Sequence, residues 1–215
     1  IHLIETESVE LNGFNKDNHY LLVGIHGNGS GYLKTALYAE LKADPKSYKV
    51  KFLAKGAKDG NKPKKIVAEL HQIETNGKNH LILLVKSGLS DQCFKNIVEF
   101  LDTNVTFKQV VVYDSLHLSK TILPEDSPDT LYAIKNSRQL QSNQLIKPKN
   151  LPAPNTIQDF AAYLITYYDF KDVPCVVYVL VTSLYEVCLD SIRHYETPTY
   201  DFLRDKLTQS YLDQN

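Results

Sequence analysis

Four uninterrupted apolar runs constrain the fold more than any other feature of this sequence. They occupy residues 19–25, 80–85, 109–113 and 175–181. A strand forms a continuous apolar run when both faces of its sheet are covered. A fifth run, residues 48–54, alternates instead and places Lys49 and Lys51 on one face, which predicts a strand nearer the edge of the sheet.

Segments with helical spacing separate these runs. Leu33, Ala36, Leu37 and Leu41 fall on one helical face after a glycine-rich turn. Further helices are predicted to open at Pro63 (apolar positions Ile66, Val67, Leu70 and Ile73), after Ser90, at Asn155 or Thr156, near Leu184, and after Thr197-Pro198. Because strands and helices alternate, the sequence predicts a three-layer α/β fold with a mostly parallel central sheet.

Residues 115–154 interrupt this alternation. Pro124, Pro128, Pro148, Pro152 and Pro154 punctuate the segment, and no hydrophobic period is sustained through it. Only residues 131–134 are apolar enough to dock onto a core. A chain of 215 residues fits one sizeable core. We therefore expect a single α/β domain over residues 1–215, with a long irregular insertion around 115–154.

Composition excludes several classes of protein. The net charge of −1 gives no field that would favour nucleic acid or an acidic membrane as a partner. Cys93, Cys175 and Cys188 are odd in number and lack CxxC spacing, which argues against disulfides and against a thiolate metal site. The first residues lack the basic start of a signal peptide, and no apolar run could span a bilayer. We expect a cytoplasmic or also nuclear protein.

A glycine-rich turn at residues 27–31 lies where phosphate-binding loops join a strand to a helix. Lys34 and Thr35 come two residues too late for a P-loop, and Tyr32 stands where the dinucleotide fingerprint needs glycine. A nucleophile elbow at Ser30 would need glycines at positions 28 and 32. The pattern therefore favours a tight structural turn, and the sequence predicts no cofactor.

Polar residues at the carboxyl ends of parallel strands share one rim, where ligands of such folds bind. The predicted rim holds His26, Ser30, Lys86, Ser87, Asp114, Ser115, His117, Thr182 and Ser183. Asp114, His117 and Ser30 could form an Asp-His-Ser arrangement if the fold brought them together. Strand ends are also polar simply because they meet water, and no histidine spacing indicates a metal site. The sequence assigns no catalytic, cofactor-binding or metal-ligating residue.

Tyrosine is abundant, with fourteen residues against no tryptophan. Eight lie late in the chain, at positions 163, 167, 168, 178, 185, 195, 200 and 211. Tyrosine is favoured at protein interfaces, and it is equally common on half-buried helix surfaces. The sequence leaves these two interpretations open.

The last third of the chain resembles the proteasome assembly chaperone 1 family. The resemblance is carried by Leu151-Pro-Ala-Pro-Asn155, by Asp159-Phe-Ala-Ala-Tyr-Leu164 and by Val173-Pro-Cys-Val-Val-Tyr178. Weaker similarity covers residues 21–41, 80–113 and 131–135. The family's C-terminal hydrophobic-Tyr-any tripeptide has no counterpart, because this chain ends Ser210-Tyr-Leu-Asp-Gln-Asn215.

The resemblance implies a chaperone without enzymatic activity. Family members pair with an assembly chaperone 2 subunit, promote assembly of the proteasome α-ring from its α-subunits and block wrong associations. Their fold is similar to that of nucleoside phosphorylases. The alternative is a nucleoside- or phosphate-handling α/β enzyme that uses the strand-end rim. We expect the rim to be open, with Ser30, Asp114 and His117 converging, in the enzyme, and filled in the chaperone.

Overall fold

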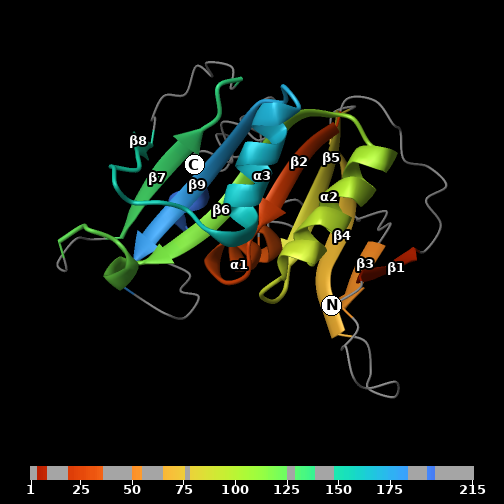
Figure 1. Ribbon diagram of the computed structural model, residues 1–215, viewed down its shortest axis with the longest axis horizontal. Coiled ribbons are helices and arrows are strands. Elements are labelled where there is room, and N and C mark those ends of the chain that lie inside the picture. Colours follow the sequence, from red (N-terminus) through yellow and green to blue (C-terminus); the bar gives the residue numbers. More distant parts are fainter. Residues whose placement is uncertain are drawn as a thin grey trace, which may run out of the picture.

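The computed structural model describes residues 4–8, 19–35, 50–54, 65–75, 78–124, 129–138, 148–183 and 193–196. Within them, nine strands form one sheet in the order β1-β3-β4-β5-β2-β6-β9-β7-β8 (Figure 1). The strands are β1 (Ile4–Ser8), β2 (His19–Gly24), β3 (Val50–Ala54), β4 (Lys65–Thr75), β5 (Lys78–Val85), β6 (Phe107–His117), β7 (Thr130–Lys135), β8 (Lys149–Asn150) and β9 (Cys175–Thr182). The helices are α1 (Asn28–Thr35), α2 (Asp91–Asn104) and α3 (Asp159–Phe170), with short 3-10 turns η2 (Leu118–Lys120) and η3 (Arg193–Tyr195).

The sheet is mixed, whereas the sequence predicted a mostly parallel one. Its centre, β5-β2-β6-β9, is parallel throughout. On one side β4 runs antiparallel to β5, and β3 and β1 continue in antiparallel fashion; on the other side β7 runs antiparallel to β9. The four buried apolar runs include all four central strands, so the pattern of continuous burial located the parallel centre but not the flanks.

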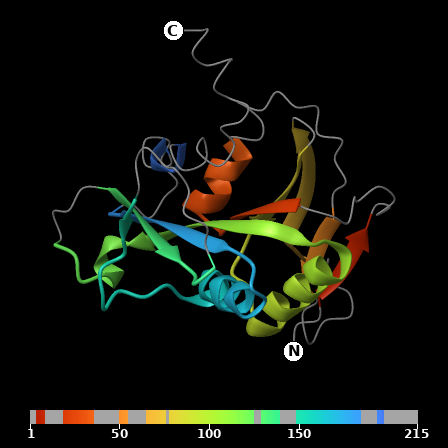
Figure 2. The same cartoon turned by 90° about the horizontal axis from the view of Figure 1, so that it is seen from above.

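Helices cover both faces of this sheet. Figure 2 shows α2 and α3 on one face, and α1 with η3 on the other. Side chains alternate accordingly along β6: Val110 and Val112 join the cluster that contains α2 and α3, whereas Val111 and Tyr113 join the cluster that contains α1 and Tyr195. The period of two along a strand produces this division of the core into two layers.

The helix predicted to open at Pro63 is wrong, because residues 65–75 form the strand β4. Leu53 pairs with Ile66 and Phe52 pairs with Ala68, so Val67 is an extra residue in the ladder, a β-bulge. The bulge places both Val67 and Ala68 in the same buried cluster as Leu70. This break in alternation makes the apolar positions of β4 mimic helical spacing.

The insertion at 115–154 is more regular than predicted. Strand β6 continues to His117, and β7 adds an antiparallel strand beside β9, with Ala133 opposite Tyr178. The apolar residues 131–134, predicted to dock onto a core, lie within β7. Helix α3 starts at Asp159, later than the predicted Asn155 or Thr156, because Asn155 closes a turn by donating to the Pro152 carbonyl at 2.9 Å.

Other predictions agree with the structure where it describes the residues. The five predicted strands are present, and α2 starts directly after Ser90. Cys93 and Cys175 are buried free thiols, while Cys188 and the helices predicted near Leu184 and after Pro198 lie outside the described residues. In the described segments no helix has the length and apolar character needed to cross a bilayer.

Candidate functional site

The glycine-rich turn brings α1 against the centre of the sheet. A Cβ atom on Gly29 would lie 2.0 Å from the Tyr113 carbonyl oxygen of β6, and one on Gly24 would lie 2.7 Å from the Gly29 carbonyl oxygen. Gly27 has φ of +101°, a conformation that L side chains rarely adopt. The glycines are therefore required for close packing and for the turn itself, in agreement with the structural interpretation of this motif.

The turn also consumes its own backbone donors. The amide of Ser30 donates to the Ile25 carbonyl at 2.7 Å, and that of Gly31 donates to the Gly27 carbonyl at 2.9 Å. A phosphate-binding loop instead directs several successive amides at the ligand. Two of the amides that would serve this purpose here are already bonded.

Tyr195 fills the space beside this turn. Its side chain is fully buried, and its ring lies 5.3 Å from that of Tyr32 and 5.4 Å from that of Tyr113, measured between centroids. Its hydroxyl donates to the main-chain carbonyl of Asp114, near the carboxyl end of β6. Burial raises the pKa of Tyr195 well above its ordinary value, so it remains a neutral donor. On the α1 face, the end of β6 is thus occupied by an aromatic cluster.

Asp114 points to the opposite face. The alternation along β6 directs its side chain toward α3, where Asp159 contributes an electrostatic repulsion. Burial is the main cause that raises its pKa to about 7, with a smaller contribution from Asp159 in the same direction. The Ser115 amide, which donates to Oδ1 at 2.8 Å, partly offsets this rise.

His117 joins the ends of two strands. Its Nδ1 accepts a hydrogen bond from the Ser119 amide at 3.2 Å, and its Nε2 lies 2.9 Å from the Ser183 carbonyl oxygen. Because a carbonyl only accepts, Nε2 carries the proton and donates. Both ring nitrogens are engaged in a contact that ties β6 to the residue after β9, which is a structural role.

The predicted rim residues therefore do not assemble an Asp-His-Ser site. Ser30 lies in α1 on one face of the sheet, and the Asp114 carboxylate lies on the other. Lys86 is bound to Glu69 of β4 at 2.7 Å, and Thr182 is buried at the end of β9. His26 and Ser183 are exposed, whereas Ser87 and Ser115 are half-buried. Among the described residues no three His, Cys, Asp or Glu side chains gather closely enough to hold a metal ion.

The late tyrosines divide between the two interpretations that the sequence left open. Tyr168, Tyr178 and Tyr195 are core residues. Tyr163 and Tyr167 are half-buried on the outer side of α3, and positions 185, 200 and 211 lie outside the described residues. Sequence reasoning noted Tyr195 as one of a group but missed its role in filling the strand-end rim, because its partners Tyr32 and Asp114 are distant in the chain.

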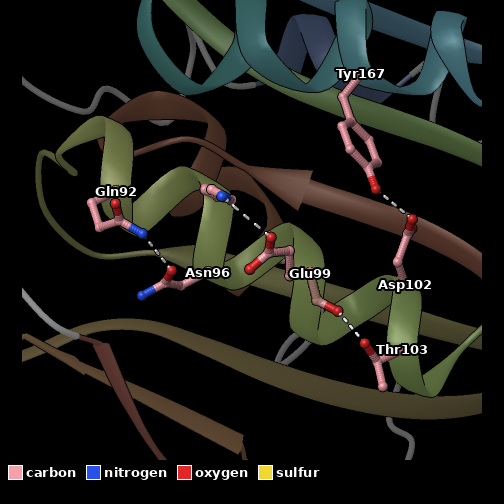
Figure 3. Close-up of polar contacts among 7 residues, drawn as sticks. Gln92, Asn96, Glu99, Asp102, Thr103 and Tyr167 are labelled. Atoms are coloured by element: carbon pink, nitrogen blue, oxygen red, sulfur yellow. Dashed lines mark hydrogen bonds and ion pairs between the residues drawn. The ribbon is translucent and has the colours of Figure 1, made fainter.

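A second polar cluster joins α2 to α3. The Tyr167 hydroxyl donates to Oδ2 of Asp102 at 2.5 Å, and Lys171 Nζ lies 3.1 Å from the same oxygen (Figure 3). Lys171 also lies 5.4 Å from the centre of the Tyr167 ring. Desolvation is the first cause that raises the pKa of Tyr167, followed by its hydrogen bond to Asp102. No sequence signal linked these residues, which are brought together by the packing of the two helices.

Comparison with solved structures shows which proteins share this fold. PbaB of Pyrococcus furiosus, described as an archaeal proteasome activator, aligns over 92% of this chain and 88% of its own, with a TM-score of 0.67 and 11% identity. PbaA of the same organism, described as an archaeal homolog of proteasome-assembly chaperone, aligns over 92% and 86%, with a TM-score of 0.62 and 14% identity.

A bacterial protein extends this group. A PAC2 family protein from Streptomyces avermitilis aligns over 88% of this chain and 87% of its own, with a TM-score of 0.55 and 14% identity. No protein-family model and no curated protein matches the sequence. At these identities the likeness shows a shared fold over most of the chain.

Proposed function

We propose that this protein is a proteasome-assembly chaperone. It pairs with a second subunit of the assembly chaperone 2 type, promotes assembly of the core α-ring and blocks off-pathway association of α-subunits. The observation that carries the proposal is the shared fold, over about nine-tenths of the chain, with solved structures described as a proteasome activator and as a homolog of proteasome-assembly chaperone. The sequence blocks at residues 151–155, 159–164 and 173–178 support the same family independently of the fold.

The strand-end rim supports a binding role over an enzymatic one. Tyr195 occupies the α1 side of the rim, and Ser30 and Asp114 lie on opposite faces of the sheet. We therefore propose a nucleoside-phosphorylase-like fold without the corresponding chemistry, acting in the cytoplasm and also in the nucleus. No observation in the described residues favours the alternative nucleoside- or phosphate-handling enzyme.

Affinity purification of the tagged chain from its own cells, followed by mass spectrometry, tests the proposal. We expect one assembly-chaperone subunit in equimolar amount, together with proteasome α-subunits and without mature β-subunits. Depletion of the chain should slow the appearance of α-rings on native gels. A purification that returns neither class of protein, from cells in which the chain is soluble, would contradict the proposal.

A further inference from the structure

Helix α3 carries two stripes of large side chains on different sides. Phe160, Ala161, Leu164 and Tyr168 form the first stripe and are buried against the sheet. The second stripe, which we call the outer stripe, consists of Tyr163, Thr166, Tyr167 and Phe170 at spacing i, i+3, i+4 and i+7. Phe170 is 86% exposed, and no charged residue lies between Asp159 and Asp169. A helix that is apolar on all sides is normally covered on all sides.

The neighbouring helix α2 shows the contrast. Its outward residues Gln92, Asn96, Glu99 and Thr103 form a polar row with hydrogen bonds along the helix (Figure 3). These contacts are what a solvent-facing helix usually presents. The outer stripe of α3 thus differs in kind from the exposed surface beside it, and its heptad-like spacing is the one that anchors a packed helix.

The two tyrosines of the outer stripe are already held in place. The rings of Tyr163 and Tyr167 stack with centroids 5.9 Å apart, and Tyr163 lies at the same distance from Phe94 of α2. The Tyr167 hydroxyl is fixed by Asp102 at 2.5 Å. Side chains ordered before binding reduce the entropic cost of association. Exposed Phe170, next to this rigid pair, has the character of an interface anchor.

Charge around the outer stripe indicates what kind of chain covers it. Asp172 is neutralised by Arg138 at 2.6 Å, and Asp102 by Lys171 at 3.1 Å. Asp159 and Asp169, one at each end of α3, make no salt bridge with a described residue. Two hydrogen bonds from Ser137 lower the pKa of Asp169, so that carboxylate is charged at neutral pH.

A second copy of this chain fits this charge pattern poorly. If two α3 helices packed antiparallel, Asp159 of one would approach Asp169 of the other; if they packed parallel, each carboxylate would face its own copy. Like charges placed opposite one another are unfavourable in either orientation. We infer that the outer stripe docks a helix from a different protein chain, whose apolar stripe is flanked at both ends by Lys or Arg. Identifying that chain as the second assembly-chaperone subunit rests on the proposed function.

Two synthetic amphipathic helical peptides test the surface directly. Both carry the same leucine stripe, and one has lysines and the other glutamates beside it; binding to the full chain is followed by fluorescence anisotropy. We expect the lysine peptide to bind roughly tenfold more tightly than the glutamate peptide. Phe170→Glu should weaken its binding by roughly tenfold or more, and Asp159→Asn should narrow the difference between the two peptides.

Ile122→Glu is the matched control. Ile122 is the other exposed large apolar residue among the described ones, at 63%, and it lies outside α3. Its variant should bind the lysine peptide like the parent chain, and circular dichroism should show that both glutamate variants are folded. Equal binding of the two peptides, or indifference of lysine-peptide binding to Phe170→Glu, would overturn the inference.

The same variants separate this inference from the proposed function. With the purified assembly chaperone 2-type subunit, Phe170→Glu should lower affinity roughly tenfold or more while Ile122→Glu leaves it unchanged. If that subunit binds the Phe170→Glu variant at full affinity, the docking surface is wrong and the function stands. If that subunit does not bind at all, yet the peptides behave as expected, the partner's identity is wrong and the docking surface stands.

Discussion

The hydroxyl of Tyr195 donates a hydrogen bond to the main-chain carbonyl of Asp114, 81 residues earlier in the chain. This contact places a neutral, fully buried aromatic side chain where α/β sheets usually bind their ligands. The rings of Tyr32 and Tyr113 enclose Tyr195 on the same face. The strand-end rim is therefore part of the core on this side of the sheet.

Truncating Tyr195 is expected to cost far more stability than removing its hydroxyl alone. Tyr195→Ala leaves a cavity between Tyr32 and Tyr113 and should lower the free energy of unfolding by about 3–5 kcal/mol. Tyr195→Phe keeps the ring and loses one hydrogen bond, at about 1 kcal/mol. Urea denaturation measures both; a loss below about 1 kcal/mol for Tyr195→Ala would show that the residue does not fill the core.

Gly29 should tolerate no side chain. In Gly29→Ala the new Cβ would lie 2.0 Å from the Tyr113 carbonyl, so α1 must move away from the sheet. We expect a loss of at least about 3 kcal/mol in the free energy of unfolding.

Gly88 provides the comparison, because a Cβ atom there meets nothing within 4 Å. Gly88→Ala should change stability by no more than about 0.5 kcal/mol in the same urea titration. Equal stabilities of the two alanine variants would show that the glycine turn is not a close-packing device.

Asp114 should make stability fall as the pH rises toward neutrality. Its pKa is raised from 3.8 to about 7 on folding, so the folded state binds a proton that the unfolded state releases between those two values. The stabilising protonated form is lost over that window, with a total effect on the order of 3 kcal/mol. Asp114→Asn should flatten the stability profile between pH 4 and 7 and stabilise the fold at pH 8. An unchanged slope in the Asn variant would show that the carboxylate does not titrate in this window.

Replacing Ser30 with alanine is expected to leave biological activity intact. The residue lies in α1, away from the Asp114 carboxylate on the other face, and no catalytic arrangement includes it. His117→Ala should also retain activity, although it removes the contact with the Ser183 carbonyl and should lower stability modestly. Proteasome assembly in cells carrying each variant is the readout. Loss of assembly in a stably folded Ser30→Ala protein would favour the enzyme alternative.

Sequence patterns located the parts of the fold whose burial is simple. Strands β2, β5, β6 and β9 are covered on both faces, and their continuous apolar runs reflect this directly. Strand β4 was predicted as a helix because its bulge at Val67 breaks the period of two. Strand β7 lies in a proline-rich segment and gains its stability from pairing with β9, a contact that no local pattern encodes.

The candidate site was less predictable than the fold. The failed glycine motifs correctly indicated a structural turn at residues 27–31. Whether Ser30, Asp114 and His117 converge depends on which face each side chain occupies, and a shift of one residue in register reverses that face. The filling of the rim by Tyr195 and the contact of Tyr167 with Asp102 arise only when distant elements pack.

Reconstitution of α-ring assembly tests the central claim most directly. The purified chain, its assembly chaperone 2-type partner and the α-subunits are mixed and analysed by size-exclusion chromatography with light scattering. The proposed function predicts a one-to-one heterodimer of the two chaperones, which raises the yield of α-rings and lowers that of irregular α-subunit aggregates. A stable monomer that binds neither the partner nor the α-subunits, with ring yield unchanged, would contradict it.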